Sequence, residues 1–139
     1  MNAGFRLLAH TADLGIESWG PDLAAALEQA VCALGALLGG AGAGRTVEAR
    51  PVRLAADDED SLVVALLQEA LFLLEAEGWL SVAAALGVDG DGRLAGDLLG
   101  EPFDALRHAE GQAVKAVTWH GLSVARAPGR VTVTVYLDL

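Results

Sequence analysis

The last nine residues of the chain, 131–139, alternate strictly between apolar and polar side chains. A period of two is typical of a strand with one buried face. The positions expected on that buried face are Val131, Val133, Val135, Leu137 and Leu139. Looser alternation predicts further strands at residues 5–9, 13–19 and 46–56. Because proline cannot donate a hydrogen bond to a neighbouring strand, Pro51 indicates that the segment 46–56 lies at a sheet edge or carries a bulge.

Two other segments repeat their apolar side chains at helical spacing. The first helix is expected to open with Pro21 and to end at the glycines that begin with Gly39. The second follows the acidic run 57–60 and continues to about residue 77. We interpret the acidic run as a cap of the helix N-terminus rather than as a metal cluster, because carboxylates there accept hydrogen bonds from unpaired N–H groups.

The second half of the chain is expected to contain further strands but no further long helix. Residues 79–88 and 93–99 are predicted to form a hairpin, and residues 114–126 one long strand or two. Strands therefore follow one another at both ends of the chain without helices between them. This order predicts an α+β fold: a mixed, largely antiparallel sheet with two long helices packed on one face, in a single domain of residues 1–139.

The composition narrows the classes of function. Apolar residues make up 53% of the chain, which excludes a disordered protein. Nine basic and nineteen acidic residues give a net charge of −10. Direct binding of nucleic acid is not expected, because it depends on lysine and arginine, and a basic protein partner or a cation suits this charge better. The uncharged run 30–44 is too short to cross a bilayer, so we expect a cytoplasmic protein without membrane contact.

Several short motifs resemble known sites, but their surroundings do not fit. Residues 39–46 nearly spell a phosphate-binding loop, but a helix precedes them and a strand follows, the reverse of what that loop needs. The loop that begins at residue 89 departs from a calcium-binding loop at three positions, where Arg93, Leu94 and Gly100 stand in place of an Asp or Asn, a Gly and a Glu. The segment 121–125 lies inside a predicted strand and lacks the last glycine of a nucleophile elbow. No compact zinc-ligand spacing relates Cys32, His10, His108 and His120.

The terminal strand carries the first candidate for chemistry. Two carboxylates lie next to one another here, the side chain of Asp138 and the α-carboxylate of Leu139. Such hard oxygen donors suggest a cation site, and a third carboxylate from another part of the chain would be expected to complete it. A candidate for the third lies in His10-Thr11-Ala12-Asp13, which joins the first two predicted strands. Taken alone, this segment is explained as an ordinary turn, in which the side chain of Thr11 or Asp13 accepts a hydrogen bond from a nearby backbone N–H group.

Motifs along nearly the whole chain together resemble the archease family. The matching segments are His10-Thr11-Ala12-Asp13 with the apolar positions after it, the helix at residues 61–72, Gly100-Glu101 followed by His108, the strand 114–120, and the ending Leu137-Asp138-Leu139. Arg107 stands where the family has a lysine. The order and spacing of these segments make the resemblance specific.

The resemblance implies a protein cofactor and not an enzyme. Archeases activate the GTP- and manganese-dependent RNA ligase of the RtcB type, which seals tRNA exons and broken RNA, by promoting its guanylylation and multiple turnover. The family's metal site corresponds to Asp13, Asp138 and Leu139. Oxygen donors without sulfur or nitrogen favour Ca²⁺ first, then Mg²⁺ or Mn²⁺, over zinc. His10, Lys115 and His120 are candidates for a supporting contact to this site or to the partner.

The sequence leaves two other functions open. One is a chaperone or specificity modulator of RNA-modifying enzymes, a role also proposed for archeases. The other is a small metal-dependent hydrolase, which would need a nucleophile and a base that the chain does not display. Glu69, inside the second helix, could pair with Lys115 or His120, although an exposed helical face explains it more simply.

Overall fold

The computed structural model describes residues 2–9, 13–40 and 44–139. Within these ranges the chain forms seven strands and two helices. In order they are β1 (Gly4–Ala9), β2 (Asp13–Gly20), α1 (Leu23–Gly39), β3 (Glu48–Ala55), α2 (Glu59–Glu77), β4 (Trp79–Val88), β5 (Arg93–Pro102), β6 (Ala116–Ala127) and β7 (Arg130–Asp138). Neither helix in the described part is long and apolar enough to span a membrane.

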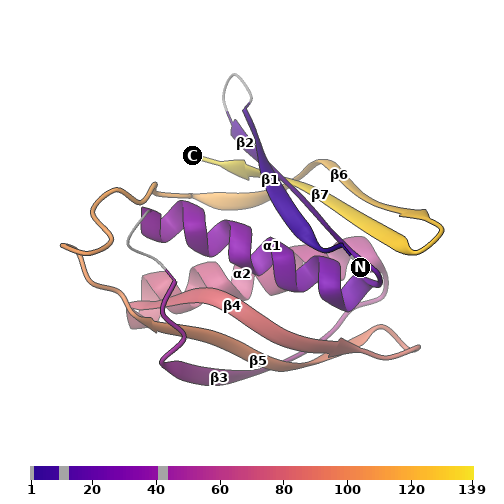
Figure 1. The fold of residues 1–139 in the computed structure, drawn as a ribbon, viewed down its shortest axis with the longest axis horizontal. Coiled ribbons are helices and arrows are strands. Elements are labelled where there is room, and N and C mark those ends of the chain that lie inside the picture. The colour runs from indigo at the N-terminus through magenta and orange to yellow at the C-terminus, as the bar shows by residue number, and fades with distance from the viewer. Residues whose placement is uncertain (1, 10–12, 41–43) are drawn as a thin grey trace.

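The strands form two sheets rather than one. The first sheet has the order β1-β2-β7-β6 and the second the order β3-β5-β4, and every neighbouring pair is antiparallel. Both helices lie between the sheets, so the molecule has three layers (Figure 1). The expected α+β class is confirmed. The expected single mixed sheet with helices on one face is replaced by two antiparallel sheets that enclose the helices.

The burial of α1 explains this arrangement. Every residue of α1 except Ala36 is buried or half-buried. A helix that is apolar over most of its circumference must be covered on more than one side. Gly35 permits the second contact, because a Cβ atom there would collide with the carbonyl oxygen of Ser81 in β4. One sheet therefore packs on each side of α1.

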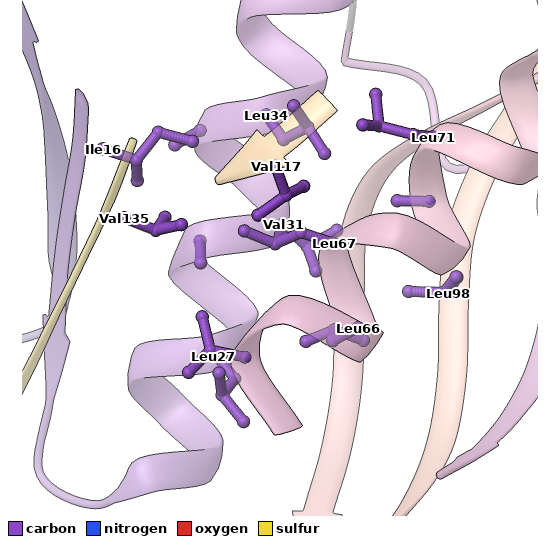
Figure 2. Packing of buried hydrophobic residues seen from close by; sticks show 14 of the residues in the cluster. Ile16, Leu27, Val31, Leu34, Leu66, Leu67, Leu71, Leu98, Val117 and Val135 are labelled. Atoms are coloured by element: carbon purple, nitrogen blue, oxygen red, sulfur yellow. The ribbon is translucent and has the colours of Figure 1, made fainter. Parts of the chain in front are cut away.

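The core joins the helices to both sheets (Figure 2). Its central members are Ile16, Leu27, Val31, Leu34, Leu66, Leu67, Leu71, Leu98, Val117 and Val135. The alternation expected for the terminal strand is confirmed, since Val133, Val135 and Leu137 are 0% exposed. The strand β7 is thus held in the middle of its sheet, between β2 and β6.

The ends of the helices largely follow the sequence predictions. The Asp58 carboxylate accepts a hydrogen bond from the Ser61 N–H at 2.7 Å, which confirms the acidic run as a cap. Asp22 caps α1 in the same way, so the helix begins at Leu23, and the expectation that it opens with Pro21 was wrong. Asp22 provides a side-chain acceptor at this position, whereas Pro21 has none.

Two details of the sheets also bear on the predictions. Pro51 lies in β3, an edge strand, as expected, while the bulge is in β4 between Ser81 and Ala83. The segment predicted as one strand or two is the single strand β6. Its pairing with β7 shifts register between Thr118 and Ser123.

Candidate functional site

Asp13 and Asp138 are direct partners in the antiparallel pairing of β2 with β7. Residues so paired have Cβ atoms about 5 Å apart. On its other side Asp138 is paired with Ala116 of β6, and its carbonyl oxygen accepts a hydrogen bond from the Lys115 N–H at 2.7 Å. Two carboxylates separated by most of the chain therefore lie side by side at the ends of the two central strands of the sheet, close together as the resemblance led us to expect.

Both carboxylates lie on the face of the sheet that points away from the helices. Side chains alternate along a strand, and the neighbouring Leu137 is fully buried on the helix side. Asp13 is half-buried and Asp138 is exposed. Leu139 directly follows Asp138, and its side chain packs against the core.

The ring of Tyr136 lies next to this pair on the same face. A Cβ atom at Gly15 would be 2.8 Å from one edge of the ring, and one at Gly121 would be 2.8 Å from the other edge. The ring therefore extends across the sheet from β2 to β6, over two positions that have no side chain. The two glycines and Tyr136 form an ordered surface beside Asp13 and Asp138, which the sequence analysis did not identify.

Electrostatics favours a cation at this position. Like charges directly opposite one another on neighbouring strands destabilise a sheet, and a bound cation removes the repulsion. The donors are all oxygens, which suits Ca²⁺, Mg²⁺ or Mn²⁺. Among the described residues, no group of three or more His, Cys, Asp or Glu side chains is arranged to hold a metal ion. The third donor of the predicted site, at Leu139, is a main-chain carboxylate.

The three supporting residues named from the sequence have different positions. His10 lies outside the described residues. The side chain of Lys115 is exposed, and its N–H group holds Asp138. His120 is exposed in the irregular part of β6. No ion pair in the described part of the chain joins Glu69 to Lys115 or His120. Glu69 is half-buried, so the expectation that it lies on an exposed helical face was wrong as well.

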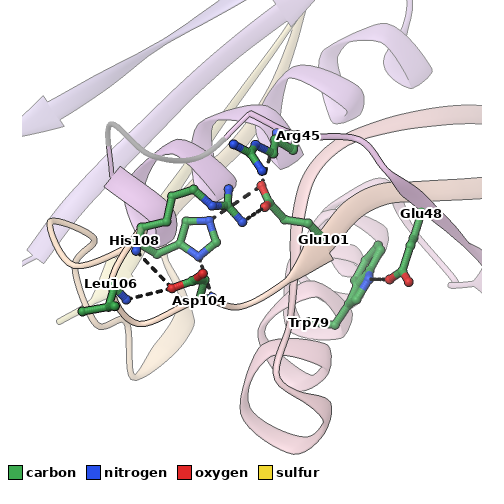
Figure 3. A network of polar contacts seen from close by, with 8 residues as sticks. Arg45, Glu48, Trp79, Glu101, Asp104, Leu106 and His108 are labelled. Carbon is green, nitrogen blue, oxygen red and sulfur yellow. Dashed lines mark hydrogen bonds and ion pairs between the residues drawn. The ribbon is translucent and has the colours of Figure 1, made fainter.

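A second polar cluster surrounds the buried carboxylate of Glu101 (Figure 3). Glu101 is 1% exposed, pairs with Arg107, and accepts a hydrogen bond from the Arg45 N–H at 3.2 Å. His108 is 2% exposed, and its Nε2 lies 3.6 Å from Glu101 Oε2. The Nδ1 atom of His108 accepts the Asp104 N–H at 2.9 Å, so a neutral ring carries its proton on Nε2, facing Glu101.

The charge state of Glu101 follows from these contacts. Burial opposes ionisation, but the hydrogen bonds from Arg107 and from the Arg45 backbone, with the positive charge nearby, lower the pKa of Glu101 below its usual value. The carboxylate is therefore ionised and paired at neutral pH. Its signal in the sequence was the match of Gly100-Glu101 and His108 to the family pattern, which did not indicate a buried cluster.

The Glu101 cluster fixes the segment 103–115, which carries the chain from β5 in one sheet to β6 in the other. The same segment packs on the C-terminal end of α1. There the Gln112 N–H donates to the Leu37 carbonyl at 2.8 Å, and a Cβ atom at Gly111 would collide with the Leu38 carbonyl oxygen. The segment ends at Lys115, whose N–H holds Asp138.

Comparison with known proteins identifies the family of this chain. The model of the archease protein family matches residues 5–139. The chain belongs to the archease family. It is 31% identical over 125 residues to protein archease of Pyrococcus furiosus, with 86% of each chain covered.

Two solved structures share the archease fold described here. The solution structure of Methanobacterium thermoautotrophicum protein 1598 matches with a TM-score of 0.76 and 30% identity, covering 98% of this chain and 99% of that one. The crystal structure of an archease from Thermotoga maritima, described as a possible chaperone, matches with a TM-score of 0.65 and 21% identity, covering 96% of each chain.

Proposed function

We propose that this archease is a non-enzymatic protein cofactor of an RtcB-type RNA ligase. It promotes the GTP- and manganese-dependent guanylylation of the ligase and its multiple turnover in tRNA splicing or RNA repair. It acts through a divalent cation bound by Asp13, Asp138 and the α-carboxylate of Leu139. The observation that carries this proposal is the direct cross-strand pairing of Asp13 with Asp138.

The chain's own residues support such a role in three ways. The ladder between β2 and β7 orients the two carboxylates before any ion arrives, and the Lys115 N–H holds the backbone of Asp138 from the other side. Exposure of Asp138 leaves the site open to a partner. A cation bound there would supply positive charge toward phosphate oxygens. Because the protein provides only a few ligands, coordination positions on the cation would stay open for such oxygens.

The net charge of −10 supports a protein partner that is itself basic. A ligase that handles RNA presents lysine and arginine to phosphate groups, and an acidic surface is attracted to such a protein. The archease therefore acts on the ligase and not on RNA directly. We place this encounter in the cytoplasm.

The test follows guanylylation of the cognate RtcB-type ligase with GTP and Mn²⁺, with and without the archease. We expect wild-type archease to accelerate the reaction, and Asp13→Asn or Asp138→Asn to abolish most of the acceleration. Asp97→Asn is the matched control, because Asp97 lies on β5 in the other sheet. Normal acceleration by both site variants would refute the metal-dependent mechanism.

A second measurement concerns Leu139. Its deletion moves the terminal carboxylate by one residue and leaves both aspartate side chains in place. We expect weaker binding of Ca²⁺ by isothermal titration calorimetry. Unchanged affinity would limit the site to Asp13 and Asp138.

A chaperone function is the second candidate, since the Thermotoga maritima relative is described as a possible chaperone. This function predicts that the archease suppresses the aggregation of unrelated client proteins. Two results together would favour the chaperone function. Asp138→Asn archease would suppress client aggregation as well as the wild type does, and neither the wild type nor the variant would change the rate of guanylylation.

A further inference from the structure

An apolar hollow of about 350 Å³ lies between the C-terminal half of α2 and the segment 103–114. Leu71 and Leu74 line it from the helix, and Phe103 and Val114 line it from the segment. Glu75, which is exposed, also lines it. A hollow with apolar walls and few polar groups is the usual form of a binding pocket in proteins.

The wall of this hollow is fixed without a ligand. The ring of Phe103 lies 5.1 Å from the ring of His108, which the Glu101 cluster holds in place. The Phe103 N–H also donates to the carbonyl of Gly78, directly after α2, at 2.7 Å. A preformed pocket loses little conformational entropy when it is filled, which favours binding.

The turn that forms the wall also exposes apolar side chains. Leu106 is 91% exposed, and Phe103 is 39% exposed. Hydrogen bonds from the N–H groups of Leu106 and Arg107 to the Asp104 carboxylate hold the turn, and Leu106 points away from Glu101 (Figure 3). Exposed apolar residues gathered beside a hollow mark an interaction surface.

We propose that this hollow and the turn beside it form a docking surface for the protein partner. The partner inserts an apolar side chain between Leu74 and Phe103 and places a basic side chain next to Glu75. The charge of the archease selects such a partner, because Glu75 at the hollow and Glu110 in the adjoining segment are exposed carboxylates in a chain with a net charge of −10.

The identity of this partner as the RNA ligase rests on the function proposed above. The docking surface is joined to the metal site by the chain itself, because the segment 103–115 runs from Phe103 to the Lys115 N–H that holds Asp138. Val114, which lines the hollow, directly precedes Lys115, so the hollow extends to the strand end that carries Asp138. The hollow provides affinity, and Asp13 and Asp138 act on the ligase.

The test measures binding of the full archease chain to the purified ligase by calorimetry, without GTP. Leu106→Ser removes almost no contact within the archease, so its melting temperature is expected to stay unchanged while the affinity falls about tenfold. Glu75→Lys is expected to cause a similar loss. Asp91→Lys makes the same change of charge in the turn between β4 and β5, near the N-terminus of α2, and is the control, which we expect to bind as wild type.

Filling the hollow distinguishes docking of the ligase from self-association of the archease. Ala113 lines the hollow and is exposed, so Ala113→Trp can fill it from outside the core. Wild-type affinity of Leu106→Ser, Glu75→Lys and Ala113→Trp for the ligase would overturn the proposal. The proposal would also be overturned if the wild-type archease self-associates in analytical ultracentrifugation and Ala113→Trp abolishes this self-association, because the occupant of the hollow is then a second copy of the chain.

The two proposals fail in different ways. If the wild-type archease binds the ligase but Asp13→Asn and Asp138→Asn still accelerate guanylylation, the metal mechanism fails and the docking surface stands. If those variants lose activity while the three surface variants bind as wild type, the docking surface fails and the proposed function stands.

Discussion

The substitution Glu101→Gln tests the buried polar cluster most directly. The side chain keeps its size, but one of its two acceptor oxygens becomes an NH₂ donor. That donor faces either Arg107 or the Arg45 N–H, and both of these groups donate. A hydrogen bond to a charged group contributes about 2 kcal/mol, and leaving a buried donor unpaired costs about 1 kcal/mol more.

We therefore expect Glu101→Gln to lower the free energy of unfolding by about 3 kcal/mol at pH 7. For a chain of this length, such a loss lowers the melting temperature by about 10 °C. Urea unfolding followed by circular dichroism measures the effect. Glu110→Gln is the control, because Glu110 is exposed in the same segment, and it should change stability by less than about 0.5 kcal/mol.

The pH dependence gives a second, independent check. The folded-state pKa of Glu101 is lower than its ordinary value of 4.5, so its stabilising effect is fully present above that value. The effect is lost as the pH falls through the folded-state pKa, where the carboxylate takes up a proton. The stability of the wild type and of Glu101→Gln should therefore converge in acid. A gap that stays constant down to about pH 3, or no gap at pH 7, would refute this account of the cluster.

Two further substitutions test other parts of the structure. Gly15→Val places side-chain atoms against the ring of Tyr136, which a Cβ atom would already approach to 2.8 Å, so we expect a loss of about 1–3 kcal/mol in urea unfolding and weaker Ca²⁺ binding in calorimetry. Wild-type values for both would show that the ring does not order the site. Asp58→Ala removes the cap of α2 and should cost about 1 kcal/mol by thermal unfolding, whereas Asp57→Ala, one residue earlier, should cost less. Equal losses would contradict the assignment of the cap.

Local elements and their ends could be predicted from the sequence because neighbouring residues decide them. The alternation in residues 131–139 predicted both β7 and its buried face, and the acidic run before α2 predicted the cap that Asp58 provides. The family resemblance directed attention to Asp13 and Asp138, and the structure places them opposite one another. Their binding of a metal ion stays a prediction.

The pairing of strands could not be predicted. An apolar face indicates that a strand is buried on that side, but it does not indicate which helix or sheet packs against it. The sequence was therefore consistent with one sheet, whereas the structure divides the strands between two sheets that enclose α1 and α2.

The Glu101 cluster was missed for a related reason. Glu101, Arg107 and His108 are ordinary polar residues along the chain, and the burial of Glu101 and His108 arises only where the segment after β5 folds back onto the end of α1. Local propensity and periodicity are properties of short stretches, so the sequence determined the helices, the strands and their caps. Contacts between distant segments depend on how the layers close, so the tertiary structure alone decided the two sheets, the pairing register of Asp13 with Asp138 and the ion pair of the buried Glu101 with Arg107.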